Sequence, residues 1–375
     1  MKIIIFILIF LFSQIYLINF IWKNSFYLQK KIYPLESYFT LNSIDCSHQR
    51  VDKELIKYLV EDFGSLRNHL VKYQNGQLSS CSTGWQKFPY ISEKITQDTN
   101  FRIASLTKIF TSYEILKLVN DSKIRLNDSF VNSISNFPKE VNDNRINSIT
   151  LEHLLSHKSG FDRIKSLDVV MEQGKIPWCQ ANIYKLAEQK LDFNPGLYYA
   201  YDNRNSCLLG WLLEKKQNKN LQEIFNTYNF KIASLYKIKN EVSYDFRYSK
   251  EWTEEDLKKF DYKGLISSAG VVTSGKNFAI QLKKISTENF FNLKKILIKD
   301  LCVENEICEN TGFNLIKYKN NKFLIKQGYM PSSISWVVYN AKGDFIVWLG
   351  SSSGKLDSNI QRDQIKYKLM DELID

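Results

Sequence analysis

Histidine is scarce in this sequence, with four residues among 375, and this scarcity narrows the chemistry that the chain can support. A serine–histidine–aspartate triad can assemble from distant residues, but no Gly-x-Ser-x-Gly nucleophile elbow is present. His153 and His157 are four residues apart, as helical metal ligands would be, yet the usual His-Glu-x-x-His pattern is absent. Leucines flank both histidines, which favours structural side chains on a buried helix face.

Other absences exclude further classes of function. The sequence has no glycine-rich phosphate loop, no paired-cysteine zinc spacing, no internal repeat and no low-complexity tract. Its net charge is +11, but the lysines are dispersed and form no basic run interleaved with aromatics, which argues against nucleic-acid binding. Compositional bias and attraction to an anionic envelope are both compatible with this charge. We expect no cofactor, no metal and no nucleic-acid partner.

The N-terminal segment indicates how the chain is attached to a membrane and on which side the following domain lies. Residues 3–22 are almost wholly apolar, and this run is long enough to cross a bilayer. No small-x-small cleavage signal follows, so residues 1–22 are predicted to be a membrane anchor, with a cleaved signal segment as the alternative. The lysines after the run, taken alone, would place the following domain in the cytoplasm.

Six cysteines are compatible with either disulfides or buried free thiols. Cys302 and Cys308 could close a short loop. Cys207 precedes two leucines in an apolar helical stretch, where we expect it to pack as a small hydrophobe.

A nucleophile and a potential base occur three residues apart in Ser105-Leu-Thr-Lys108. Apolar residues recur at helical spacing downstream, so the two side chains would share one face at the start of a helix. There the helix dipole favours developing negative charge on the serine oxygen. The same spacing begins at Ser234 and Ser352, but neither has a comparable helix behind it.

Two later motifs add to this pattern. Tyr201-x-Asn203 follows a Pro-Gly turn and leads directly into an apolar helix. Lys326-x-Gly328 lies in a predicted strand, where the glycine would let another backbone approach closely. Similar but isolated triplets begin at Tyr73 and Lys158.

In this order, the three motifs resemble those of the penicillin-recognising serine hydrolases, closest to the class C β-lactamase and D-alanyl-D-alanine carboxypeptidase branch. Residues 124–128, 149–161 and 269–274 also resemble segments of that family. The resemblance covers roughly residues 60–355. It implies a catalytic domain outside the cytoplasm, in the periplasm or at the cell surface, or secreted if the segment is cleaved.

The resemblance also implies roles for individual residues. Ser105 would attack a carbonyl and form an acyl-enzyme, with Lys108 and Tyr201 managing the proton. Asn203 would orient Lys108 or the substrate amide, and Lys326 would supply positive charge. Backbone N–H groups of Ser105 and Tyr329 would form the oxyanion hole, which stabilises the tetrahedral intermediate.

The chain departs from the family pattern beside Lys326. Gln327 stands where relatives have threonine, next to Gly328, and Tyr329 and Met330 replace a small, glycine-rich continuation. These bulky residues are expected to narrow or redirect the cleft and to weaken recognition of a terminal carboxylate. The predicted function is hydrolysis of an amide, peptide or ester. The alternatives are an esterase acting outside peptidoglycan and a catalytically silent envelope scaffold.

Hairpin signals at both chain ends predict the architecture. An Asn-Gly turn follows the strand-like residues 69–74, and residues 334–349 form a second hairpin pattern. We therefore predict an α+β fold, an α/β sandwich in which both ends build one antiparallel sheet flanked by helices. Residues 23–60 are expected to be a connector, and residues 61–375 the hydrolase domain, with an inserted all-helical region at roughly 120–265.

Overall fold

The computed structural model describes most of the chain. The described residues are 13–15, 18, 26–47, 53–166, 182–234, 236–250, 252–299, 302–308, 310–356 and 358–374. The predicted anchor, residues 1–22, lies almost entirely outside them. Within the described ranges, no helix has the length and apolarity needed to span a membrane.

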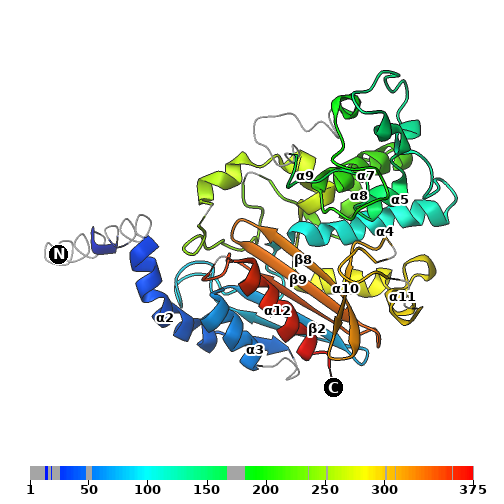
Figure 1. Ribbon diagram of the computed structural model, residues 1–375. Helices are drawn as coiled ribbons and strands as arrows, with labels where there is room; N and C mark the ends of the chain where they lie inside the picture. The colour runs from blue at the N-terminus through cyan, green and yellow to red at the C-terminus, as the bar shows by residue number, and fades with distance from the viewer. Residues whose placement is uncertain are drawn as a thin grey trace, which may run out of the picture.

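A seven-stranded antiparallel sheet, in the order β1-β3-β2-β10-β9-β8-β7, forms the centre of the molecule (Figure 1). Its strands are β1 (Asp45–Ser47), β2 (Asn68–Gln74), β3 (Gln77–Thr83), β7 (Asn314–Tyr318), β8 (Asn321–Met330), β9 (Ser333–Asn340) and β10 (Phe345–Gly350). The N-terminal strand β2 pairs with the C-terminal strand β10. The predicted sheet built from both chain ends is thus confirmed, as is the α+β class.

Both predicted hairpins are present. The Asn75–Gly76 turn joins β2 to β3, and both turn residues have positive φ, as a tight hairpin turn requires. The second hairpin joins β9 to β10. A small second sheet, in the order β4-β6-β5, links β4 (Phe101–Arg102), β5 (Lys231–Ile232) and β6 (Val271–Thr273).

Helices cover both faces of the large sheet and form a separate region at one end (Figure 1). They are α2 (Phe26–Asn42), α3 (Lys53–Tyr58), α4 (Thr107–Asn120), α5 (Leu151–Leu155), α7 (Asn203–Gln217), α8 (Leu221–Asn226), α9 (Tyr262–Ala269), α10 (Gly275–Ile285), α11 (Leu293–Lys299) and α12 (Asn359–Asp371). Helices α4, α5, α7, α8 and α9 gather beside one end of the sheet, where β8 and β9 contact the turn Ala104–Leu106 that precedes α4 (Figure 1).

Alternation along the strands divides the apolar residues between two cores. Val347 of β10 faces the larger core, which it shares with residues of α4 and α10. Its neighbours Ile346 and Trp348 face a smaller core, formed with residues of α3 and α12. The sheet is therefore buried on both faces, which fixes its register and holds the strand β8 in place.

The stretch predicted as a connector packs onto the rest of the fold. A disulfide joins Cys46 of β1 to Cys81 of β3. On α2, Glu36 forms a buried ion pair with Arg247, whose guanidinium also binds Asp245 at 2.9 Å. These contacts fix α2 and β1 against residues that lie far along the chain.

Candidate active site

Ser105 lies in a single 3₁₀ turn, Ala104–Leu106, immediately before α4. Ala104 has a φ of 46°, in the left-handed region that residues with a Cβ rarely adopt. Two hydroxyls of β9 hold the segment before the turn: Ser333 donates to the Arg102 carbonyl and Ser335 to the Ile103 carbonyl, both at 2.7 Å. The strained turn is therefore fixed to the sheet.

Gly328 permits this close approach of strand and turn. A Cβ at this position would lie 2.2 Å from the Ile103 carbonyl oxygen and 2.2 Å from Ser335 Oγ. Because real atoms do not approach so closely, only glycine fits. The close backbone approach expected for the Lys-x-Gly motif is found here, with the turn that carries Ser105.

Lys108 lies one turn further along the same helix face and is buried, with only 2% of its surface exposed. Its Nζ donates to Ser105 Oγ at 3.2 Å, to Asn203 Oδ1 at 2.8 Å and to the Ser268 carbonyl at 2.8 Å. These three acceptors match the three N–H groups of an ammonium. These contacts fix the Lys108 amino group beside Ser105.

Tyr201 also contacts Ser105, and its hydroxyl donates to Ser105 Oγ at 2.7 Å. The phenol ring stacks on His157, with ring centroids 4.6 Å apart. Burial, followed by the charges of Lys326 and Lys108, holds the pKa of His157 well below its usual range. His157 is therefore a neutral support for the Tyr201 ring.

The local sequence explains why Tyr201 and Asn203 meet Ser105. Asp202, between them, is the N-cap of α7 and accepts a hydrogen bond from the Arg204 backbone N–H at 2.8 Å. Its carboxylate also forms a buried ion pair with the Arg204 guanidinium at 2.6 Å. The cap holds the residues on either side of it at the start of the helix.

Lys326 projects from β8 toward the same centre, with its Nζ 5.0 Å from the centroid of the Tyr201 ring. Burial lowers the pKa of Lys326 to about 8, and the positive charges of Lys108 and Arg163 act in the same direction, against the opposing effect of Tyr201. Close to neutral pH this lysine remains mostly charged.

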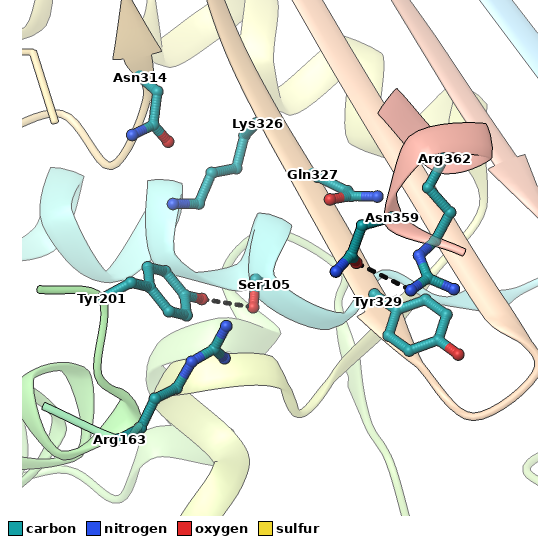
Figure 2. A pocket seen from close by; sticks show the side chains of 9 residues that line it. All are labelled: Ser105, Arg163, Tyr201, Asn314, Lys326, Gln327, Tyr329, Asn359 and Arg362. Atoms are coloured by element: carbon teal, nitrogen blue, oxygen red, sulfur yellow. Dashed lines mark hydrogen bonds between the residues drawn. The ribbon is translucent and has the colours of Figure 1, made fainter. Parts of the chain in front are cut away.

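A cavity of about 290 Å³ opens over Ser105 (Figure 2). It is lined by Ser105, Arg163, Tyr201, Asn314, Lys326, Gln327, Tyr329, Asn359 and Arg362. Ser105, Tyr201, Lys326, Gln327 and Tyr329 were predicted from the motifs, whereas Lys108, Asn203 and Gly328 lie behind the lining. Met330, expected to narrow the cleft, is instead buried in the larger core.

Four lining residues were not singled out in the sequence: Arg163, Asn314, Asn359 and Arg362. The last two come from the first turn of α12, where the Arg362 side chain donates to Asn359 Oδ1 at 2.9 Å. The Arg362 guanidinium also lies 4.1 Å from the centroid of the Tyr329 ring. Only tertiary structure brings α12 to this cavity, since no sequence motif marks either residue.

The other copies of the motifs do not line this cavity, nor do His69 and His153. His153 instead caps a short helix, its Nδ1 accepting from the Thr150 backbone N–H at 3.2 Å. His157, predicted to lie on a helix face, follows the end of α5 and has a positive φ. Across the described residues, no cluster of histidine, cysteine, aspartate and glutamate is arranged to hold a metal ion.

The cysteines are disulfide-bonded wherever the structure describes them. The short loop closed by Cys302 and Cys308, which the sequence allowed, is present. Cys207 is buried in α7 as expected, but it too is disulfide-bonded, which corrects the prediction of simple hydrophobic packing.

Comparison with known proteins gives matches in both sequence and fold. Residues 85–250 match the family model described as Beta-lactamase. A curated relative, the "Putative fimbrial assembly protein FimD, serogroup D" of Dichelobacter nodosus, is 28% identical over 360 residues, covering 91% of this chain and 90% of its own.

Solved structures show the fold. A β-lactamase/D-alanine carboxypeptidase from Pseudomonas syringae is 13% identical with a TM-score of 0.66, over 85% of this chain and 97% of that one. A D-amino acid amidase from Ochrobactrum anthropi SV3 is 18% identical with a TM-score of 0.63, over 83% of this chain and 95% of that one. The predicted resemblance in fold is confirmed.

Proposed function

We propose that this chain is a serine hydrolase related to the β-lactamases, which works through an acyl-enzyme on Ser105; the match of residues 85–250 to the Beta-lactamase family model and the shared fold support this. One observation carries the proposal: Tyr201 and Lys108 both hydrogen-bond the Ser105 hydroxyl oxygen, at 2.7 and 3.2 Å. A nucleophilic serine requires a neighbouring group that takes its proton, and these two are positioned to share that task.

The proposed reaction has two stages. Ser105 Oγ attacks the substrate carbonyl, and its proton passes to the Tyr201–Lys108 pair, which acts as the general base after losing one proton. Tyr201 then gives the proton to the leaving amine or alcohol as the scissile bond breaks. Water attacks the resulting acyl-enzyme, loses a proton to Tyr201 and releases the acid, and Ser105 regains its hydrogen.

Two electrostatic features support this assignment. Lys108, Lys326 and Arg163 all lie within 5.0 Å of the Tyr201 ring centroid, so their charges stabilise negative charge on that side chain. The backbone N–H groups of Ser105 and Tyr329 are proposed to bind the oxyanion, because Gly328 brings β8 close to the Ser105 turn.

The substrate is proposed to carry an anionic group, since the cavity is lined by cationic and neutral polar or aromatic side chains. Gln327 keeps open the esterase alternative: its Nε2 is buried without a hydrogen-bond partner among the described residues, and it replaces the hydroxyl of the Lys-Thr-Gly pattern. The amide N–H group of Gln327 can only donate a hydrogen bond, whereas a hydroxyl can both donate and accept. The two groups therefore favour different substrate geometries.

The chain is further proposed to act outside the cytoplasm, attached to a membrane through its N-terminal segment or secreted after cleavage. Disulfides at Cys46–Cys81 and Cys302–Cys308 support this location, because such bonds persist in oxidising compartments.

The test is the intact mass of the protein after incubation with penicillin and, separately, with a fluorophosphonate. A penicillin adduct that is absent from Ser105→Ala supports a penicillin-recognising hydrolase, and a fluorophosphonate adduct alone supports the esterase. If folded wild-type protein gives neither adduct, the hydrolase proposal is wrong.

A second candidate function is a part in the assembly of surface fibres, which the name of the 28%-identical relative favours. Loss of fibres in a deletion strain, with full rescue by Ser105→Ala, would assign this role to the fold alone. Rescue by the wild type but not by Ser105→Ala would make hydrolysis part of assembly.

A further inference from the structure

Positive charge approaches the cavity from two sides. Arg163 comes from the loop after α5, and Arg362 from α12 beyond β8, with Ser105 between them (Figure 2). No carboxylate is found among the described residues that line the cavity. An anion-binding group on each side of the nucleophile matches a substrate with two separated negative charges.

The turn that carries Arg163 is held firmly. The Asp162 backbone N–H donates to Asp192 Oδ2 at 2.8 Å, and Asp162 Oδ1 in turn accepts from the Ile164 backbone N–H at 2.9 Å. Ser166, at the end of the turn, donates to the same Asp192 oxygen at 2.9 Å. These bonds close the turn at both ends.

The turn is also tied to the helix that positions Tyr201. Arg204, buried in α7 and paired with Asp202, donates to Ser166 Oγ at 2.9 Å. The Arg163 guanidinium carbon then lies 4.8 Å from the centroid of the Tyr201 ring. Because this turn is fixed, the exposed Arg163 side chain starts from a defined backbone position, which lowers the cost of ordering it around a ligand.

The surroundings of Arg163 are electrically unfavourable without an anion. Lys326 and Lys108 each have their Nζ 5.0 Å from the same ring centroid. His157, on that ring, is neutral because burial and these cations lower its pKa. Besides burial, the charges of Lys108 and Arg163 both lower the pKa of Lys326, so these cations repel one another, and a bound oxyanion relieves the repulsion.

We propose that Arg163 forms a second anion subsite, which binds a carboxylate or phosphate of the substrate on the side of the scissile carbonyl opposite Arg362. This inference rests on the proposed hydrolase function and narrows its substrate class to compounds with an anionic group on both sides of the cleaved bond. Arginine suits both oxyanions, because its planar fork donates two parallel hydrogen bonds.

The experiment measures binding of simple acids to the full-length chain by calorimetry. Glutarate and adipate are compared with butyrate, and 3-phosphonopropionate distinguishes phosphonate from carboxylate preference. Wild type is expected to bind the best dianion about tenfold more tightly than butyrate. This factor corresponds to one additional charge-assisted hydrogen bond, made by Arg163 to the second anionic group.

Arg163→Gln should remove this preference, with butyrate affinity unchanged. Lys165→Gln is the matched control, because Lys165 lies in the same turn but contacts Phe193 and does not line the cavity. Equal losses in the two variants, or no preference for dianions in wild type, would overturn the subsite.

Ser105→Ala separates this proposal from the hydrolase proposal. If it retains the dianion preference and wild type gains a fluorophosphonate adduct, both proposals stand. A dianion preference that depends on Arg163, in a wild-type protein that is never labelled, would leave the subsite standing and remove the hydrolase function.

Discussion

Ser335 of β9 donates its hydroxyl to the Ile103 carbonyl at 2.7 Å, two residues before the proposed nucleophile. Through this bond the sheet fixes the turn that carries Ser105. Gly328, on the neighbouring strand, is the residue that lets the turn come so close. The position of the nucleophile thus depends on contacts with β8 and β9 as well as on its own helix.

Gly328→Ala should displace this turn, because the new methyl group would lie 2.2 Å from both the Ile103 carbonyl and Ser335 Oγ. We expect fluorophosphonate labelling of Ser105 to slow by at least about a hundredfold, since small misplacements at a reacting centre are costly. The double variant Gly328→Ala/Ser335→Ala removes one clash but leaves the Ile103 carbonyl. Full recovery in the double variant would show that the backbone contact is unimportant.

Tyr201→Phe should slow the same labelling reaction by about 10²- to 10⁴-fold, as loss of a general base does. The control is Tyr199→Phe, since the Tyr199 hydroxyl accepts from Asn314 at 3.1 Å. Burial raises the pKa of Tyr199 to about 12, which makes it a poor base near neutral pH. Similar rates in the two variants would contradict the role proposed for Tyr201.

Binding of anions should weaken above pH 8. Because burial lowers the pKa of Lys326 to about 8, the side chain is charged below this pH and loses its charge as the pH rises. The dissociation constant of butyrate should rise by about tenfold between pH 7 and 9, if its binding needs the charged form. Lys326→Arg keeps its charge over this range, so its profile should be flat. If butyrate affinity falls with rising pH in both proteins, a group other than Lys326 is responsible for the titration.

His69 should make the fold sensitive to acid. It is completely buried in β2, where burial lowers its pKa to about 3. The unfolded chain therefore binds a proton below about pH 6.5 that the folded chain does not, and stability falls as the pH drops from there toward 3. Between pH 7 and 5 this one group should cost about 2 kcal/mol of unfolding free energy.

Urea unfolding of wild type and His69→Gln at the two pH values measures this contribution. The variant is expected to lose less stability on acidification, by about 2 kcal/mol, even if it is less stable at both pH values. Identical pH dependence in the two proteins would show that His69 does not titrate differently in the folded and unfolded states.

Local patterns were sufficient to predict the two hairpins and the strand of Lys326. Each depends on residues close in sequence, such as the Asn75–Gly76 turn between β2 and β3. Tyr201 and Asn203 could also be found, because a rigid Pro-Gly turn and a helix start occur together beside them. These signals are local, and the structure brings their residues together at Ser105.

Residues contributed by distant segments could not be found in this way. Arg362 and Asn359 reach the cavity only because α12 packs on the sheet, and nothing near them in sequence marks a site. Arg163 lies close to a family-like segment, but the turn that carries it is held by Asp192, in another loop. Met330 was predicted to line the cleft because it follows Tyr329 in the sequence. In the structure its side chain is buried in the larger core.

The pairing of Val71 in β2 with Val347 in β10 has a consequence for biogenesis. Until the ribosome has synthesised β10, β2 has an unpaired edge, and the chain between them cannot close into the sheet. Contacts between such distant segments slow folding, because a long loop must be ordered first. The central sheet of the nascent chain therefore stays incomplete until translation is almost finished.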